Sequence, residues 1–466
     1  MEADRLSQSP ALLSAGALTR SGISASLALL AGGALRLWML WKFFEVNGDS
    51  RLYGGMAKNL LLHGRYALTD IRGALHPTLI RLPGYPLYLA ACFRLFGMEN
   101  YYWAACTQIV LELVGCILLA LFVRRIAPPA YKTSAAHATL WLAVLCPFTA
   151  VYAAEPLTES LTLFCLCLGL WSAARFQDRP GWKNALAFTF AVTYAALLRP
   201  DGVLVGLSLA PALGAAAARH IRLTAICLLL ALAPFAAWTW RNWHVFRVVE
   251  PLAPRYATDP GEDTWPGFQR WVKTWSLDFV STYEVYWNVP GGPMDVAALP
   301  ARAFDSPEQR AQTAKLAAAY EANGEELSPG LDQRFGQLAA DRIEAHPLRY
   351  YMALPVGRVA DMWLRPRVEN LPIDLDWWVY RHHHVETRFS WFYAALNALY
   401  LALAIAGFCL RPRLWLPMLA YLLLRSALLA TIEAPEARYT LEGFPILFAL
   451  GGIAIGRMFR KRPTSG

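Results

Sequence analysis

Charged residues are scarce in this 466-residue chain, at 17%, while apolar residues make up 56% of it. The sequence also contains no internal repeat, P-loop or serine-nucleophile motif that would indicate a second activity. Its mean hydropathy of +0.31 and its 18 tryptophans exceed what a soluble chain of this length normally carries. The composition excludes an ordinary soluble protein and predicts a polytopic membrane protein.

Cysteine is absent from the long segment 241–388, and each of the eight cysteines lies in an apolar stretch. An oxidising compartment favours pairing in exposed segments, so we predict no structural disulfide. Cys165 and Cys167 are two residues apart on an expected helix and point to different faces, which makes them poor partners for a metal ion.

Apolar windows of about 20 residues can cross a bilayer core of about 30 Å as helices. About ten such windows are present, at 22–43, 102–123, 134–153, 156–174, 184–199, 202–218, 222–240, 389–410, 413–431 and 441–458. No small-residue cleavage site follows the first apolar run, so we expect the first span to stay as an anchor.

Lysine and arginine are retained in cytoplasmic loops. Alternate short loops and the C-terminal tail are basic. The second and third spans are joined by a loop with Arg124, Arg125 and Lys132, the fourth and fifth by one with Arg175, Arg179 and Lys183, the sixth and seventh by one with Arg219 and Arg222, and the eighth and ninth by one with Arg411 and Arg413. The tail contains Arg457, Arg460, Lys461 and Arg462. This pattern predicts that both termini are cytoplasmic and that segments 44–101 and 241–388 face outward.

Three regions are expected from this topology. They are a membrane module at 1–240 that includes the first outer loop, an outer-facing segment at 241–388, and C-terminal helices with a basic tail at 389–466. The net charge of +9 is then largely a topology signal, and no nucleic-acid partner is expected.

The first outer segment begins with Gly48-Asp49-Ser50 and continues with residues at helical spacing, namely Leu52, Met56, Asn59, Leu60 and His63. We predict a short surface helix that Asp49 or Ser50 caps and Gly64 ends. Asp49 would place a carboxylate at the exit of the first span, where a lipid head group and a substrate can both reach it. The alternative is that Asp49 only caps the helix.

A second motif, Arg81-Leu82-Pro83-Gly84-Tyr85-Pro86, precedes an apolar helix of about 12 residues. Proline and glycine fix the turn, and the arginine would lie at head-group depth. An arginine fork suits a phosphate, but it suits an anionic membrane lipid equally well.

Two acids and an arginine lie at the ends of expected spans. Glu159 begins a span, and Glu155 would share its face if the intervening turn is helical. Ionisable groups at membrane depth usually face a cavity and have a function, although Glu155 could be a solvated first-turn acid. Arg199 precedes Pro200-Asp201, so a local salt bridge is its alternative role.

Taken in order, several motifs resemble the GT-C superfamily of polyprenyl-phosphate-sugar-dependent glycosyltransferases, in particular the bacterial branch related to protein O-mannosyltransferases and lipid A aminoarabinose transferases. They are Gly48-Asp49-Ser50 to Tyr53, Arg81 to Pro86, Thr158-Glu159-Ser160-Leu161, Leu198-Arg199-Pro200, Trp240-Arg241-Asn242-Trp243 and Glu436-Ala437-Arg438-Tyr439. The resemblance covers about 1–250 and 385–460 in order and spacing.

This resemblance implies an all-α polytopic membrane protein, a GT-C type bundle of about ten transmembrane helices with juxtamembrane helices and a mostly helical outer segment. It implies a location in the bacterial inner membrane with the active site facing the periplasm. Family members take a sugar from a polyprenyl-phosphate donor and pass it, with inversion, to an acceptor hydroxyl. The sequence leaves open which sugar moves, and whether the acceptor is a lipid, a glycan or a protein.

The resemblance also suggests roles for individual residues. The first-loop acid of the family falls on Asp49, expected to be the general base, and the second acid falls on Glu159. An inverting transfer needs a base opposite the leaving group and a fixed cation for the leaving phosphate. Arg81, Arg241 and Arg438 are the candidates for that cation. Possible further substrate contacts are Tyr53, Tyr85, Glu155, Arg199 and Tyr439.

No metal ligand set is predicted, although some family members use a divalent cation. Asp374-Leu375-Asp376 lacks a surrounding nucleotide-binding fold, which makes nucleotide-sugar use unlikely on this sequence. His382-His383-His384 and Glu386 form the densest ligand cluster, but consecutive residues cannot all face one ion from a regular helix. We therefore expect a solvated loop here.

The segment 241–388 could be a small lid or an acceptor platform. An interfacial amphipathic helix is expected from the spacing of Phe268, Trp271, Trp275, Leu277, Phe279, Tyr283 and Trp287. Two solvent-facing helices are expected at 306–322 and 330–346, starting at Ser306-Pro307 and Ser328-Pro329.

Two other functions fit a membrane cavity that holds acids and arginines. A transporter or flippase of polyprenyl-linked sugars would show inverted repeats and charges near mid-membrane, whereas the charges here gather at span ends. A glycan ligase acting on a lipid pyrophosphate would share the topology, but the pair of early motifs at Asp49 and Arg81 is not expected in it.

Overall fold

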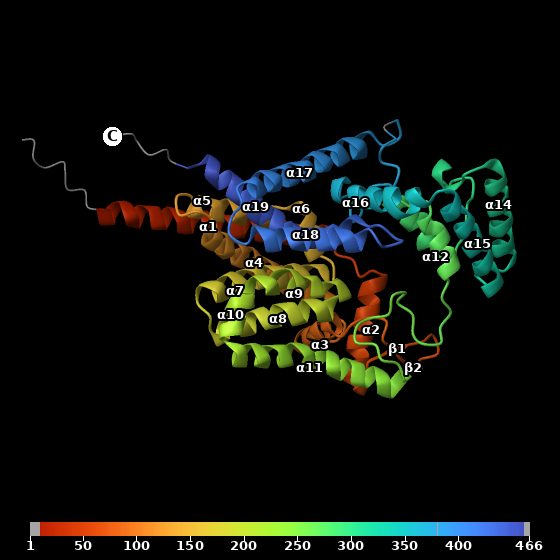
Figure 1. Cartoon of the computed structure of the whole chain (residues 1–466), viewed down its shortest axis with the longest axis horizontal. Helices are drawn as coiled ribbons and strands as arrows, with labels where there is room; N and C mark the ends of the chain where they lie inside the picture. Colours follow the sequence, from red (N-terminus) through yellow and green to blue (C-terminus); the bar gives the residue numbers. More distant parts are fainter. Residues whose placement is uncertain (1–9, 380, 461–466) are drawn as a thin grey trace, which may run out of the picture. The chain divides into compact units, whose positions relative to one another are not determined.

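The computed structural model describes residues 10–379 and 381–460, with side chains described from residue 22. The chain forms two compact units. The first unit consists of Met1–Ala257, Leu399–Tyr421 and Glu442–Gly466, and the second of Thr258–Ala398 and Leu422–Leu441. Both are built mainly from helices, as expected for an all-α polytopic membrane protein (Figure 1).

Seven helices among the described residues are long and apolar enough to cross a membrane. They are Gly22–Phe43 of α1 (Pro10–Phe43), α4 (Tyr101–Ile126), α7 (Glu159–Asp178), Pro200–Arg219, α11 (Ile221–Phe246), α17 (His384–Cys409) and Ala437–Met458. Pro200–Arg219 contains η1 (Pro200–Gly202), α9 (Val203–Leu209), η2 (Ala210–Leu213) and α10 (Gly214–Arg219), and Ala437–Met458 contains η6 (Ala437–Gly443) and α19 (Phe444–Met458).

An eighth span is formed if α5 (Lys132–Val144) and α6 (Pro147–Ala153), which meet at a bend of 53°, cross together. Pro147 at the start of α6 lacks the N–H that a continuous helix would use, which explains the break.

The ten apolar windows predicted from the sequence are all helical, but two of the helices are short. α8 (Trp182–Leu198) has 17 residues and α18 (Trp415–Leu429) has 15. At 1.5 Å per residue these helices are about 25 and 22 Å long, less than the thickness of a hydrocarbon core. By length and composition the count of spans is therefore seven or eight, below the predicted ten.

A buried ion pair joins three helices of the first unit. Nη2 of Arg36, on α1, lies 2.5 Å from Oε1 of Glu112, on α4, and both side chains are almost fully buried. Nη1 of Arg36 also donates to the carbonyl of Val144 at 2.6 Å, at the end of α5. A Cβ on Gly32 would lie only 2.5 Å from the Cβ of Val144, so glycine permits this close approach.

The first outer segment of the chain folds onto the first unit as two helices and a hairpin. α2 (Gly48–His63) is followed by β1 (Ala67–Thr69) and β2 (Leu75–Pro77), which pair antiparallel with Leu68 opposite His76. α3 (Gly84–Phe96) comes next. Figure 1 shows α2 and the hairpin at one end of the helices of this unit. The surface helix expected after Gly48 is thus present, and the hairpin was not predicted.

The second unit has a small aromatic core of its own. Its helical elements are α12 (Pro266–Lys273), α13 (Phe279–Ser281), η3 (Thr282–Tyr286), η4 (Ala301–Ala303), α14 (Pro307–Ala322), α15 (Pro329–Ala345), η5 (Arg349–Ala353) and α16 (Leu354–Leu364). Ser306 and Ser328 cap α14 and α15 as predicted, by accepting from the N–H groups of Gln309 and Leu331. In Figure 1, α12, α14 and α15 lie together.

The prediction of an interfacial helix at 268–287 is wrong. α12 ends at Lys273, and Phe268, Trp271 and Trp275 are buried in a core shared with α14 and α15, which includes Tyr320 and Phe335. The aromatic spacing correctly predicted that α12 has an apolar face. That face is covered by protein and not by lipid head groups, because it packs against the apolar face of α15.

We expect Arg36→Met to destabilise the first unit by about 3–5 kcal/mol, because it leaves the Glu112 carboxylate buried without its counter-charge. The double variant Arg36→Met/Glu112→Leu should recover much of that loss, since it removes both charges. Thermal unfolding followed by size-exclusion chromatography in detergent would test this. If the double variant is as unstable as the single one, the ion pair is not the cause.

Candidate active site

The start of α2 is fixed by Asn47 and not by Asp49. Oδ1 of Asn47 accepts from the backbone N–H and from the hydroxyl of Ser50, each at 3.1 Å. The prediction that Asp49 or Ser50 caps this helix is therefore wrong, whereas the predicted end at Gly64, with φ of +63°, is confirmed. Because Asn47 supplies the cap, the carboxylate of Asp49 is engaged elsewhere.

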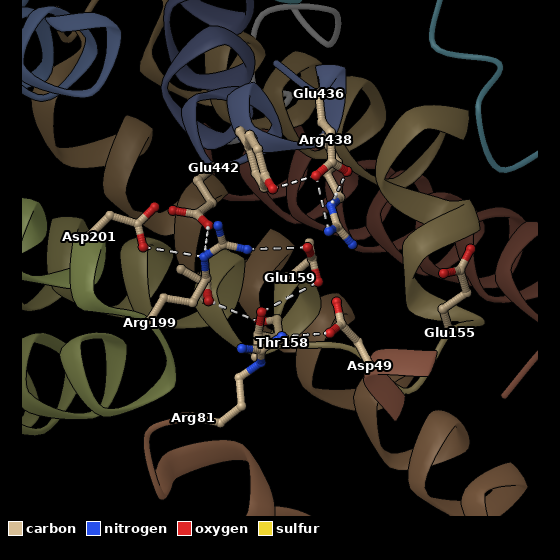
Figure 2. Close-up of polar contacts among 12 residues, drawn as sticks. Asp49, Arg81, Glu155, Thr158, Glu159, Arg199, Asp201, Glu436, Arg438 and Glu442 are labelled. Atoms are coloured by element: carbon tan, nitrogen blue, oxygen red, sulfur yellow. Dashed lines mark hydrogen bonds and ion pairs between the residues drawn. The ribbon is translucent and has the colours of Figure 1, made fainter. Parts of the chain in front are cut away.

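Asp49 pairs with Arg81, the arginine of the turn motif. Nη2 of Arg81 lies 2.9 Å from Oδ1 of Asp49, and both side chains keep about a quarter to a third of their surface accessible, 24% and 31% (Figure 2). The hydroxyl of Tyr66 donates to the carbonyl of Arg81 at 3.0 Å, which holds the backbone of the turn. Two residues singled out separately in the sequence thus form one partly exposed ion pair.

A second charged group surrounds Arg199, at the end of α8. Nη1 of Arg199 lies 3.3 Å from Oε1 of Glu159, the first residue of α7, and Nε lies 3.2 Å from Oδ1 of Asp201 and 3.4 Å from Oε1 of Glu442 (Figure 2). Glu159 and Glu442 are almost fully buried. The local bridge to Asp201 expected as an alternative does form, and Arg199 contacts Glu159 and Glu442 as well.

Glu442 was missed in the sequence, although a signal was present. It lies inside the apolar window 441–458, so the cost of an ionisable group at membrane depth would have identified it. Arg36 and Glu112 were also missed. The same signal was present for them, because each is a charged residue within a mostly apolar stretch. None of the three belongs to a recognisable motif.

Glu155 helps to hold α2. Its Oε2 accepts from Nδ2 of Asn47 at 3.4 Å, and its backbone carbonyl accepts from Nε2 of Gln108 at 2.8 Å. α6 ends at Ala153 and α7 begins at Glu159, so Glu155 lies in a non-helical turn. The expectation that Glu155 and Glu159 share one helix face fails because no helix joins them.

Tyr53 and Tyr85 pack against each other. Their rings are 5.0 Å apart in an edge-to-face arrangement, and both are buried. Burial raises the pKa of Tyr53 to about 12; Asp49 and Glu159 add to this rise, while Arg81 and Arg199 oppose it. The charges of both groups therefore act on Tyr53, and its hydroxyl stays protonated near pH 7. Burial also raises the pKa of Tyr85 well above its usual range.

Gly84 brings the turn motif against the end of α8. A Cβ at this position would lie 2.5 Å from the carbonyl oxygen of Leu197, so only glycine fits. The carbonyl of Gly84 accepts from the hydroxyl of Tyr194 at 3.1 Å. The contact explains how Arg81 and Arg199, far apart in the sequence, come to serve one region.

Arg241 is engaged with the backbone of the first outer segment. Its Nη1 donates to the carbonyl of Thr78 at 2.8 Å and its Nη2 to the carbonyl of Tyr66 at 2.7 Å. The guanidinium also lies over the rings of Tyr66, Trp238 and Phe246. These contacts place Arg241 behind the turn that carries Arg81.

Arg438 and Tyr439 belong to the second unit. Nε of Arg438 lies 2.6 Å from Oε2 of Glu436, and the hydroxyl of Tyr439 donates to Oε1 of the same carboxylate. The carbonyl of Tyr439 accepts from Nε of Arg425 at 2.6 Å. The motif at 436–439 is thus a compact ion-paired cluster.

Within residues 10–379 and 381–460, one group of His, Cys, Asp or Glu side chains is close enough to share a metal ion. It consists of Asp374, Asp376 and His383, in the second unit. The acids of the first unit described above are paired with arginine or asparagine side chains. The eight cysteines are unpaired.

Comparisons with known proteins give only distant similarity. No family model and no curated protein matches the sequence. Among solved structures, the chain is similar to ArnT from Cupriavidus metallidurans in the apo state, at 15% identity and a TM-score of 0.40 over 95% of this chain and 78% of ArnT. A structure of the same protein bound to undecaprenyl phosphate is 16% identical, with a TM-score of 0.39 over 93% of this chain and 77% of ArnT.

A third similar structure is the archaeal oligosaccharyltransferase AglB from Archaeoglobus fulgidus, in complex with an inhibitory peptide and a dolichol-phosphate. It is 12% identical, with a TM-score of 0.42 over 92% of this chain and 50% of AglB. Similarity of this degree is too low to establish a family or a function for the chain.

We expect Arg199→Gln to lower the stability of the first unit by about 3 kcal/mol, because it leaves Glu159, Asp201 and Glu442 without their shared cation. Thermal unfolding of the purified protein measures this. Arg72→Gln, at an exposed position, serves as control; an equal loss in the control would contradict the assignment.

Proposed function

We propose that this chain is an inverting glycosyltransferase that moves a sugar from a polyprenyl-phosphate donor to an acceptor hydroxyl at the outer face of the bacterial inner membrane. The observation that carries the proposal is the ion pair of Asp49 and Arg81, 2.9 Å apart and partly exposed at the start of the surface helix α2. It places a carboxylate and an arginine fork together near the exit of the first membrane span. For an inverting transfer the two must separate when the donor binds, because the base acts on the face of the sugar opposite the leaving phosphate.

The chemistry requires both groups. The acceptor oxygen attacks the anomeric carbon of the sugar while Asp49 takes up the hydroxyl proton. The bond between that carbon and the phosphate oxygen breaks, and its electron pair leaves with the polyprenyl phosphate. Arg81 offsets the charge that develops on the phosphate, a task for which its planar fork is suited.

The pairing of Asp49 with Arg81 suggests how the base is switched on. The ion pair keeps the carboxylate of Asp49 engaged with Arg81. When a donor phosphate draws the guanidinium of Arg81 away, the carboxylate becomes available to the acceptor hydroxyl at the moment when the substrate is bound. The same arginine then serves the leaving group and controls the base.

The buried group around Arg199 supplies the rigid side of the site. Glu159 is held by Arg199 at the start of α7, and the charges of both groups act on the neutral hydroxyl of Tyr53. In the proposal, Glu159 orients the acceptor or the sugar, and Tyr53 lies near it. Tyr85 is fully buried and its hydroxyl donates to Oε1 of Gln108, so it supports Tyr53 and does not contact the substrate. Any divalent cation required would act in addition to these residues.

Other predicted site residues take supporting roles. Arg241 and Glu155 bind backbone or capping groups behind the turn and behind α2, so we assign them to positioning Arg81 and Asp49. For Arg438 and Tyr439, contacts with the donor stay a proposal. The donor lipid, the surrounding membrane lipid and an acceptor that is a lipid, a glycan or a protein are the partners implied.

We expect Asp49→Asn to lower sugar transfer by about 10²–10⁴-fold, the usual contribution of a general base. Transfer from radiolabelled polyprenyl-phosphate-sugars to total membrane lipid and protein would be measured with the full-length protein. Glu45→Gln, an exposed acid in the same segment, is the matched control and should retain activity. Binding or translocation of the lipid-linked sugar without transfer, equal in wild type and Asp49→Asn, would instead indicate a carrier.

We expect the rate of sugar transfer to fall from the wild type to Arg81→Lys, and further in Arg81→Gln. Lysine keeps the charge but loses the fork, and glutamine loses both, with a fall of about 10²–10³ in kcat. Steady-state kinetics with varied donor would separate kcat from KM. Arg65→Gln, which changes an exposed arginine at the end of α2, should leave both constants near wild type. Unchanged kinetics in Arg81→Gln would remove Arg81 from the site.

A further inference from the structure

The chain between α16 and α17 folds around His383. The imidazole keeps 16% of its surface accessible. Its Nε2 lies 3.0 Å from Oδ1 of Asp376, and its Nδ1 lies 3.5 Å from Oδ2 of Asp374 and 3.4 Å from Oε2 of Glu386. The expected loop is present, with His382 and His384 exposed, and within it His383 lies against acids from both sides in the sequence.

Backbone contacts hold this arrangement in place. The N–H of His383 donates to the carbonyl of Val379 at 3.2 Å, and the N–H of Asp374 donates to Oε2 of Glu386 at 3.3 Å. The N–H of Thr387 donates to the carbonyl of His383 at 2.8 Å, which ties the turn to the start of α17. These bonds fix the backbone of His383 and Asp374 relative to the start of α17, while the carboxylates of Asp374 and Asp376 stay more than half exposed.

We propose that Asp374, Asp376 and His383 form a binding site for a divalent transition-metal ion of the Zn²⁺ type. One ligand atom from each of the three residues lies within 4.8 Å of the others, close enough to converge on one ion. One imidazole nitrogen with carboxylate oxygens is a mixed ligand set that suits such an ion. The second ring nitrogen can then donate to Glu386 or to the remaining carboxylate oxygen, which fixes the ring.

Charge balance favours a bound cation here. Three carboxylates contact this single imidazole. A divalent ion would offset two of their negative charges. Three protein ligands also leave a coordination position for water or for a further oxygen ligand.

The ion would shape a neighbouring cleft. Trp378, between the ligands Asp376 and His383, lines a cavity of about 550 Å³ in the second unit, together with Asp278 and Glu284. Burial raises the pKa of Glu284, and the charges of Asp278 and Asp376 add to this rise. A bound ion would hold the turn and so fix the Trp378 wall of this cleft.

The test uses the full-length protein, purified in detergent without a polyhistidine tag and stripped with EDTA. Equilibrium dialysis against Zn²⁺, followed by elemental analysis, should give one tightly bound equivalent. His383→Ala and Asp376→Asn should each weaken its binding at least about tenfold. His382→Ala, which changes an exposed neighbour outside the ligand group, is the matched control and should bind as wild type.

Two results would overturn the site: tight Zn²⁺ binding that His383→Ala leaves unchanged, or no tight equivalent in the wild-type protein. Thermal unfolding of the metal-free forms checks that the variants fold, and Asp374→Asn replaces any variant that does not. Hydrogen exchange of residues 374–387 with and without Zn²⁺ gives a second readout, with slower exchange expected in the wild type only. Neither measurement depends on sugar transfer.

Discussion

The cost of a charge in apolar surroundings governs the first unit. Arg36 and Glu112 meet between helices, and Arg199 is contacted by three acids, because an uncompensated ion at such positions would cost several kcal/mol. Each pair therefore fixes the positions of the helices that carry it. The fold satisfies its buried charges first, and the geometry of the candidate site follows from how it does so.

The acids of the two charged groups differ in exposure, and this difference decides what each group can do. Glu159 and Glu442 are enclosed, so their interactions with Arg199 are strong and rigid, whereas Asp49 is partly open to solvent; the two arginines are exposed to a similar extent. An open pair costs less to separate, and a phosphate can compete for its arginine. The Arg199 group can thus hold part of the site rigid, while the Asp49–Arg81 pair can open when a substrate binds.

Local signals in the sequence predicted local structure well. Gly64 ends α2 and Ser306 and Ser328 begin their helices, because these residues act through the backbone next to them. The apolar windows likewise located the helices. The cap of α2 was assigned to the wrong residue, since Asn47 and Asp49 are equally good caps by type and only the path of the chain decides between them.

Partners distant in the sequence could not be predicted in this way. The motifs placed Asp49, Arg81, Glu159 and Arg199 in one region, but not which acid meets which arginine. That choice depends on close backbone contacts such as Gly84 against Leu197. A glycine here was seen only as part of a turn, yet without a Cβ it lets the Arg81 turn pack on the helix that ends at Arg199. The motifs therefore indicate which residues make up the site, whereas the packing of the helices decides which acid pairs with which arginine.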